Sequence, residues 1–110
     1  MSNVILRFDN LGTRNDGTAA VSGGTPVRAL GSTTGNPHRQ AVNIKNHSTT
    51  DGIRVYLSQS DTAPTISASA FDVRVPANEN RTISCGGGIR AWLISESASN
   101  TCAFSALELL

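Results

Sequence analysis

The sequence predicts an all-β fold, an antiparallel β-sandwich or jelly roll, with a long polar arm or loop near the N-terminus. Short runs alternate apolar and polar residues, a period of two that is typical of strands with one buried face. Turn-forming residues close each run, since 47 of the 110 residues are Gly, Ser, Thr, Asn or Pro. The runs recur roughly every 8 to 15 residues, as in a sandwich. The length predicts one domain, residues 1–110.

The first expected strand carries Val4, Leu6 and Phe8 on one face. Residues 12–40 follow as an extended arm or loop, because polar and turn-forming residues dominate this stretch. Short pieces of strand are expected within it at 19–21 and 27–30, and full strands after it at 42–44, 53–58, 70–75, 82–85, 89–95 and 102–109. Asp51-Gly52 is a turn pair typical of hairpins, which predicts that strand 42–44 pairs with strand 53–58.

The expected core consists of the apolar members of these runs. It comprises Val4, Leu6, Phe8, Val42, Ile44, Ile53, Val55, Leu57, Phe71, Val73, Val75, Ile83, Ile89, Ala91, Leu93, Phe104, Leu107 and Leu109. Cys85 and Cys102 are expected to be small, unpaired core residues, as is usual in a reducing compartment. Gly86-Gly87-Gly88 leads directly into a strand, which predicts a tight turn or bulge and not a phosphate cradle.

The charge pattern argues against several classes of partner. Eight arginines and one lysine stand against eight carboxylates, so no strong net field attracts nucleic acid or an anionic membrane. Arg7 interrupts the opening apolar run after three residues, which is too early for a signal peptide or a membrane span. We therefore expect a protein made in the cytoplasm. The excess of arginine over lysine is typical of protein interfaces, although genomic base composition would produce it as well.

The sequence does not predict catalysis. His38 and His47 have no His, Cys or carboxylate beside them at metal-ligand spacing. The chain also contains no Gly-x-Ser-x-Gly turn of the kind that presents a nucleophilic serine. We expect a binding or structural protein that needs no cofactor and no metal.

Four stretches of the chain carry a likeness to a known family: residues 52–64, 70–73, 90–95 and 105–109. They resemble the small capsid decoration proteins, also called cement or staple proteins, of tailed bacteriophages. The resemblance implies a jelly-roll protein that forms a homodimer. It also implies that this protein binds the outer face of an icosahedral shell and clamps neighbouring major capsid subunits of the same phage. It also implies synthesis in the host cytoplasm and a final place on the outer surface of the virion.

A polar arm suits a clamp, because it can wrap a neighbouring subunit and gain order on assembly. The candidate contact residues are the basic side chains of this region and two aromatic residues, namely Arg14, Arg28, His38, Arg39, Tyr56 and Trp92.

Tyr56 and Trp92 occupy the outward positions of their strands. Either the segment 12–40 covers them, or they are exposed for contact with a partner or for stacking on a sugar ring. Sugar stacking leads to the alternative function, a lectin-like carbohydrate- or receptor-binding module on the virion surface. A small tail or head-completion protein is a third interpretation.

Overall fold

The structure is a computed structural model that describes residues 10–31 and 35–110. These residues contain no helix, and so none that could cross a membrane. Their strands are β1 (Leu11–Ala19), β2 (Val27–Arg28), β3 (Ala41–Asn46), β4 (Ile53–Ser58), β5 (Val73–Val75), β6 (Asn80–Ser84), β7 (Arg90–Ser95) and β8 (Cys102–Leu109). The expected strands 53–58 and 102–109 are confirmed to the residue, and those at 42–44, 82–85 and 89–95 to within two residues at each end.

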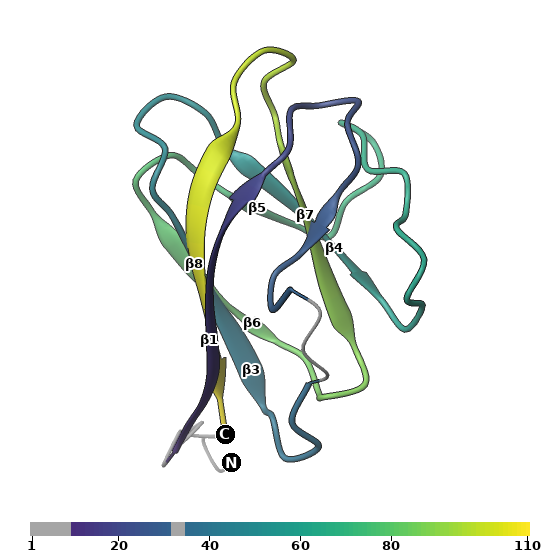
Figure 1. The fold of residues 1–110 in the computed structure, drawn as a ribbon, viewed down its shortest axis with the longest axis vertical. Coiled ribbons are helices and arrows are strands. Elements are labelled where there is room, and N and C mark those ends of the chain that lie inside the picture. The colour runs from purple at the N-terminus through teal and green to yellow at the C-terminus, as the bar shows by residue number, and fades with distance from the viewer. Residues whose placement is uncertain (1–9, 32–34) are drawn as a thin grey trace, which may run out of the picture.

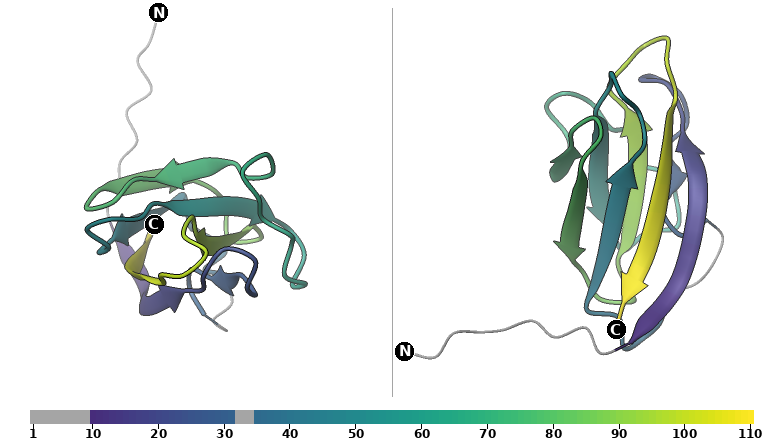
Figure 2. Two further views of the ribbon diagram at one scale, coloured as in Figure 1. Left: turned by 90° about the horizontal axis from the view of Figure 1, so that it is seen from above. Right: turned by 90° about the vertical axis from the view of Figure 1, so that its left-hand side faces the viewer.

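The strands form two four-stranded antiparallel sheets that pack face to face (Figures 1 and 2). Sheet A has the order β1-β8-β3-β6, and sheet B has the order β2-β7-β4-β5. Each strand of the first half of the chain pairs with one of the second half: β1 with β8, β2 with β7, β3 with β6 and β4 with β5. The fold is a long hairpin rolled over on itself, which is a jelly roll, and the predicted fold class is confirmed.

The hairpin expected across Asp51-Gly52 is wrong. β3 lies in sheet A and β4 in sheet B, so residues 47–52 cross from one sheet to the other. Asn46 is fully buried at this crossing, and its side-chain amide donates to the carbonyl oxygens of Asp51 (2.9 Å) and Val75 (3.2 Å). These bonds give partners to backbone carbonyl groups at the crossing. The buried Asn46 at the end of β3 therefore holds the chain in its crossing from sheet A to sheet B, which the turn pair Asp51-Gly52 did not predict.

The described residues 12–31 and 35–40 do not form an arm outside the sandwich. β1 pairs with β8 along the edge of sheet A, and β2 pairs with β7 along the edge of sheet B. The inward side of β1 carries little apolar surface, which is why alternation does not reveal it. Gly17 faces the core there, and any side chain at this position would overlap the ring of Phe104. The large residue on β8 fills the space that β1 leaves, so the neighbouring strand holds β1 in place.

The inward side chains of both sheets fill the core, as predicted for most of the apolar set. The largest that are fully buried and apolar are Phe104, Ile44, Ile53, Leu93, Val42, Val55 and Val75. Three expectations are wrong: Phe71 precedes β5 and is 36% exposed, while Leu107 and Leu109 lie half-buried on the outer face of sheet A. On β8 the even-numbered residues point inward, so Glu108 takes the buried place that its leucine neighbours were expected to fill. The expected strand at residues 4–8 lies outside the described residues.

Both thiols are buried and unpaired, as expected. Burial raises the pKa of the Cys85 thiol above its ordinary value. Cys85 immediately precedes the glycine-rich turn between β6 and β7, where the Ile89 N–H donates to the carbonyl of Gly86 (3.1 Å). The predicted tight turn is therefore present at Gly86-Gly87-Gly88.

Candidate functional site

Three of the six candidate contact residues lie side by side on the outer face of sheet B. Arg28 on β2 is opposite Trp92 on β7, and Trp92 is opposite Tyr56 on β4. The Arg28 guanidinium lies 6.0 Å from the centre of the Trp92 ring, a distance at which cation–π attraction acts. Sheet pairing thus joins residues from three separate parts of the sequence into one row.

The Trp92 ring is covered. It is 6% exposed, because Ala63 and Ile66 from the connection between β4 and β5 pack against it together with Ile94. Of the two alternatives left by the sequence, the covered face is the one observed. The cover therefore comes from the β4–β5 connection as well as from the segment 12–40, which contributes Arg28.

One end of the row carries two arginines on a single carboxylate. Arg28 Nη1 (2.9 Å) and Arg90 Nε (2.8 Å) both reach Oδ1 of Asp61. The carboxylate is 69% exposed, while the two arginines are largely covered at 21% and 29%. One negative charge does not neutralise two guanidinium groups, so this end of the face carries an excess positive charge.

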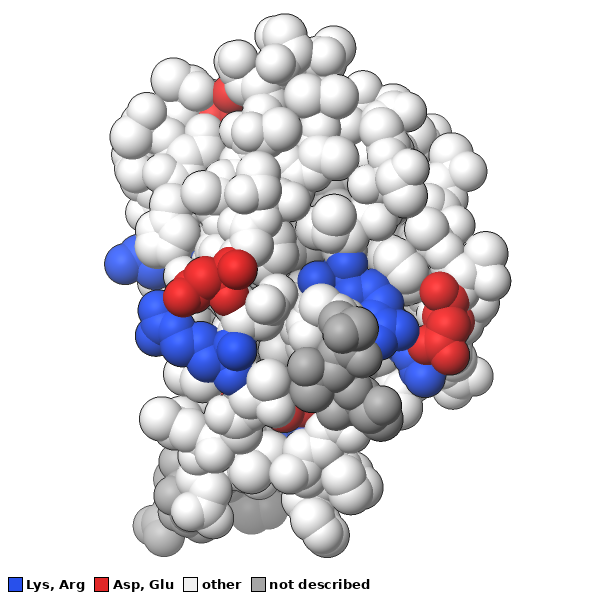
Figure 3. Space-filling model, in the orientation of Figure 1, with Lys and Arg blue, Asp and Glu red and all other residues white. Residues whose placement is uncertain are grey.

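A second group of the same kind lies on β4 and β5. Arg74 Nε donates to both carboxylate oxygens of Glu96 (2.9 Å each), and Arg54 Nε lies 3.6 Å from Glu96 Oε2. The bond from Arg74, with the positive charge of both arginines, holds the pKa of Glu96 below its ordinary value. This group also has one positive charge in excess. Figure 3 shows that basic and acidic side chains gather together in separate clusters on the face that it presents, with uncharged surface between the clusters.

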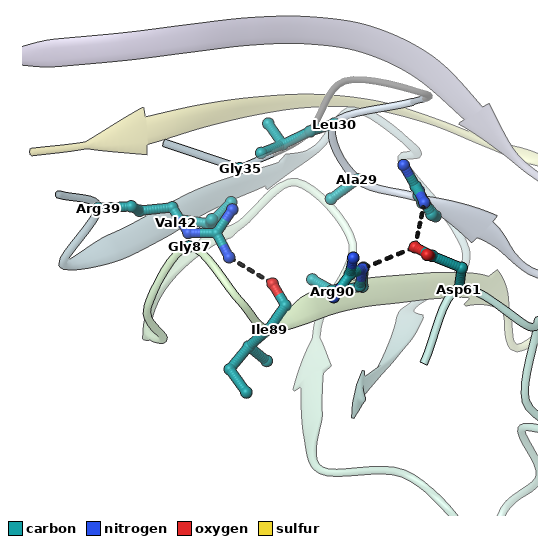
Figure 4. A pocket seen from close by; sticks show the side chains of 11 residues that line it. Ala29, Leu30, Gly35, Arg39, Val42, Asp61, Gly87, Ile89 and Arg90 are labelled. Atoms are coloured by element: carbon teal, nitrogen blue, oxygen red, sulfur yellow. Dashed lines mark hydrogen bonds and ion pairs between the residues drawn. The ribbon is translucent and has the colours of Figure 1, made fainter. Parts of the chain in front are cut away.

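A pocket of about 260 Å³ opens beside the first group. In Figure 4, Asp61 and Arg90 stand on one side of it, while Arg39 and Gly87 form the other side. Its walls between these are apolar and comprise Ala29, Leu30, Val42, Ile89 and Ala91. The polar groups on both sides already have partners within the chain.

Arg39, a candidate contact residue, is inaccessible to a partner. Its side chain is 3% exposed, and its guanidinium donates to the carbonyl oxygens of Cys85, Gly86 and Ile89. Nη1 also lies 3.4 Å from Oε2 of the buried Glu108. Arg39 therefore fixes the turn that leads into β7, where it acts as an internal strut.

Glu108 completes this buried pair, and no pattern in the sequence pointed to it. Its Oε1 accepts the N–H of Thr13 (3.0 Å), and its Oε2 accepts the N–H of Asn36 (2.9 Å). Burial, the largest influence, raises the pKa of Glu108, but these bonds and the charge of Arg39 together bring it below its ordinary value. The carboxylate stays ionised and ties β1, β8 and the β2–β3 connection together.

The other two candidate residues lie apart from the row. Arg14 is on β1 in sheet A, 63% exposed, with its Nε 3.3 Å from Oδ1 of Asp16. His38 is exposed in the turn before β3, where its N–H donates to the side chain of Asn36 (2.8 Å). The structure therefore gives no single site that uses all six residues.

A serine and a histidine that lie far apart in the sequence meet on the outer face of sheet A. His47 Nε2 lies 2.7 Å from Ser105 Oγ, and Asp16 is opposite Ser105 in the β1–β8 ladder. The Ser105 hydroxyl is the main reason that the pKa of Asp16 is lowered. In an activated serine the carboxylate holds the histidine and the histidine faces the serine. Here the serine lies between the other two on an open face, so the group serves as a polar contact between strands.

Within residues 10–31 and 35–110, no group of three or more His, Cys, Asp or Glu side chains is placed to hold a metal ion. Compared with models of protein families, with curated proteins and with solved structures, the chain gives no match.

Proposed function

We propose that the protein is a capsid decoration protein that binds the outer surface of a phage icosahedral shell and clamps neighbouring major capsid subunits. The observation that carries the proposal is the outer face of sheet B, where two arginine pairs, each sharing one carboxylate, flank the aromatic row. Each pair has one uncompensated charge, which suits acidic side chains on a partner protein. The resemblance to phage decoration proteins and the jelly-roll strand order point in the same direction.

A docking role suits this face better than catalysis does. Arginine and aromatic residues supply much of the binding energy of protein interfaces, because they combine large contact area with directional hydrogen bonds. Arg28 and Arg90 are held by Asp61 before any partner arrives, so little side-chain entropy remains to be lost on binding. On a lattice, contacts with two neighbouring subunits reinforce each other through effective concentration.

The lectin-like alternative has less support. Stacking on a sugar needs an aromatic face that is open to solvent. Trp92 is 6% exposed under Ala63 and Ile66, and only the half-buried Tyr56 remains in the row. The face offers charge and shape to a protein partner and no open aromatic platform to a glycan.

Binding to bare shells of the major capsid protein from the same phage tests the proposal. The R28Q/R90Q variant removes two charges from sheet B, and K45Q/R81Q removes the same charge from sheet A. We expect the first variant to bind shells about tenfold or more weakly, as two lost charged contacts imply, and the second to bind like the wild type. Thermal melts establish that both variants are folded.

Stoichiometry and shell stability supply the second readout. A decoration protein saturates the shell at a simple fraction of the capsid subunits, and filled heads that carry it release DNA at a higher temperature than bare heads, since it binds only the assembled state. No saturable binding, or equal stability of bare and decorated heads, would remove the proposal. Binding to a glycan array that Tyr56→Ala abolishes would favour the lectin-like alternative.

A further inference from the structure

β1 is the longest of the four strands that lie at sheet edges. It has nine residues, against two in β2, three in β5 and five in β6. In the right-hand view of Figure 2 it is the outermost strand of its sheet, beyond β8. A long edge strand presents unpaired backbone groups that can pair with another strand.

Within the part of the chain that the structure describes, the backbone groups of β1 that sheet A leaves unpaired belong to alternate residues. Directly after β8, the Leu110 N–H donates to the carbonyl of Asn10, toward β1 (2.9 Å). On β8 the carbonyl of Ala103 accepts from the N–H of His47, toward β3 (2.9 Å). The backbone N–H and C=O groups of the even-numbered residues of β8 therefore point toward β1. In the ladder these residues are opposite the odd-numbered positions 15, 17 and 19. It follows that Arg14, Asp16 and Thr18 direct their N–H and C=O groups away from the sheet.

The side chains along this edge are self-complementary. Gly17, which follows Asp16, faces the core. Because side chains alternate along a strand, Arg14 and Asp16 both project from the outer face of sheet A. They are 63% and 62% exposed and contact each other at 3.3 Å, so each has room for a second ionic partner. In an antiparallel pair of two such strands centred on Asn15, Arg14 of one copy stands opposite Asp16 of the other.

We propose that β1 is the pairing edge of a homodimer in which two copies of this chain join antiparallel about a two-fold axis at Asn15. Sheet A then continues from one copy into the other, with Arg14 and Asp16 of each copy paired with Asp16 and Arg14 of the second. This inference gives the surface and the register, and it stands independently of the proposed binding to shells.

Neighbouring registers of the same pairing are disfavoured. A two-fold register must place outward-facing residues of one copy opposite outward-facing residues of the other, so it shifts in steps of two. The step to one side places Arg14 opposite a second Arg14, and the step to the other side places Asp16 opposite a second Asp16. Like charges directly opposite each other destabilise a strand pair. The register centred on Asn15 is the one of the three that pairs opposite charges.

Sedimentation velocity on the full chain, with charge-reversal variants, tests the register. Arg14→Asp places Asp opposite Asp16, and Asp16→Arg places Arg opposite Arg14. Each single variant is expected to raise the dimer dissociation constant about tenfold or more, because both symmetric pairs become repulsive. The double variant R14D/D16R restores opposite charges and should dimerise like the wild type. A mixture of the two single variants should form a heterodimer.

Each outcome decides for or against this edge. A dimer lost in both single variants and regained in the double variant supports it. A wild-type protein that is monomeric throughout a 100-fold range of concentration that ends at millimolar overturns it. A dimer that the single variants leave unchanged also overturns it. Loss in the single variants without recovery in R14D/D16R refutes the register. Circular dichroism checks that these exposed substitutions leave the fold intact.

Discussion

Replacing Glu108 by glutamine should destabilise the protein far more than any surface substitution. The carboxylate is the ionic partner of Arg39, whose side chain is 3% exposed, and it accepts the backbone N–H groups of Thr13 and Asn36. Glutamine keeps one acceptor oxygen, but its other terminal group is NH₂, a donor, which would face groups that are themselves donors. The guanidinium then stays buried without a counter-charge.

Removing one partner of a buried ion pair costs about 3 to 5 kcal/mol. With an unfolding entropy of about 2.1 cal/mol/K per residue, a chain of 110 residues loses about 4.3 °C of Tm per kcal/mol, so E108Q should melt about 13 to 22 °C below the wild type. Glu79→Gln is the matched control, because it makes the same chemical change in an exposed pair with Arg81 (3.5 Å). An exposed pair contributes about 0 to 1 kcal/mol, so E79Q should melt within a few degrees of the wild type.

Thermal unfolding followed by circular dichroism measures both variants at pH 7. The reasoning also predicts that R39M/E108Q loses less stability than the two single variants together, because the second change removes the charge that the first leaves unpaired. If E108Q melts as close to the wild type as E79Q does, Glu108 does not hold the charge of Arg39, and the strut described here is wrong.

Three further predictions follow from the same contacts. The pKa of Glu108 is lower in the folded state than its unfolded value of about 4.5, so its contribution to stability is complete above about 4.5 and is lost as the pH falls through the folded value. The free energy of unfolding in urea should therefore depend less on pH between about pH 6 and pH 3 in E108Q than in the wild type. Gly87→Ala places a Cβ against the backbone of Asn36 and should cost about 1 to 3 kcal/mol, whereas Gly86→Ala and Gly88→Ala meet no atom within 4 Å and should cost less than the Gly87 change in the same urea titration. Ile66→Ala uncovers Trp92, the one tryptophan in the chain, so its emission should shift to longer wavelength and become accessible to iodide, and an unchanged spectrum would contradict the cover assigned to the β4–β5 connection.

The alternation of apolar and polar residues predicted the central strands well, because there each strand contributes its own apolar face to the core. It failed at β1, where Gly17 leaves the space to Phe104 on the neighbouring strand. It also failed at Asp51-Gly52, where the choice between a hairpin and a crossing depends on the buried side chain of Asn46. Local patterns cannot carry such information, since it resides in contacts between residues that are distant in sequence.

The candidate site shows the same division. Outward parity on β4 and β7 correctly placed Tyr56 and Trp92 on one face, and the β2–β7 ladder places Arg28 beside them. The pattern could not show which arginines are buried in ion pairs inside the molecule. Arg39 and Arg28 look alike in the sequence, yet Arg39 is a buried strut, whereas Arg28 lies on the outer face of sheet B that we propose binds the shell. The difference is set by Glu108, an acidic residue within an otherwise apolar strand end.

The buried pair of Arg39 and Glu108 also affects the proposed binding face. Arg39 holds the carbonyls of Gly86 and Ile89 at the start of β7, and β7 carries Arg90 and Trp92 into the row on sheet B. Loosening this turn would free the beginning of β7 before the remainder of the sheet unfolds. Binding residues are effective when the strands beneath them are rigid, since order that exists before binding need not be created by it. The strut at one end of the sandwich therefore supports the arginine and aromatic row that we propose meets the shell.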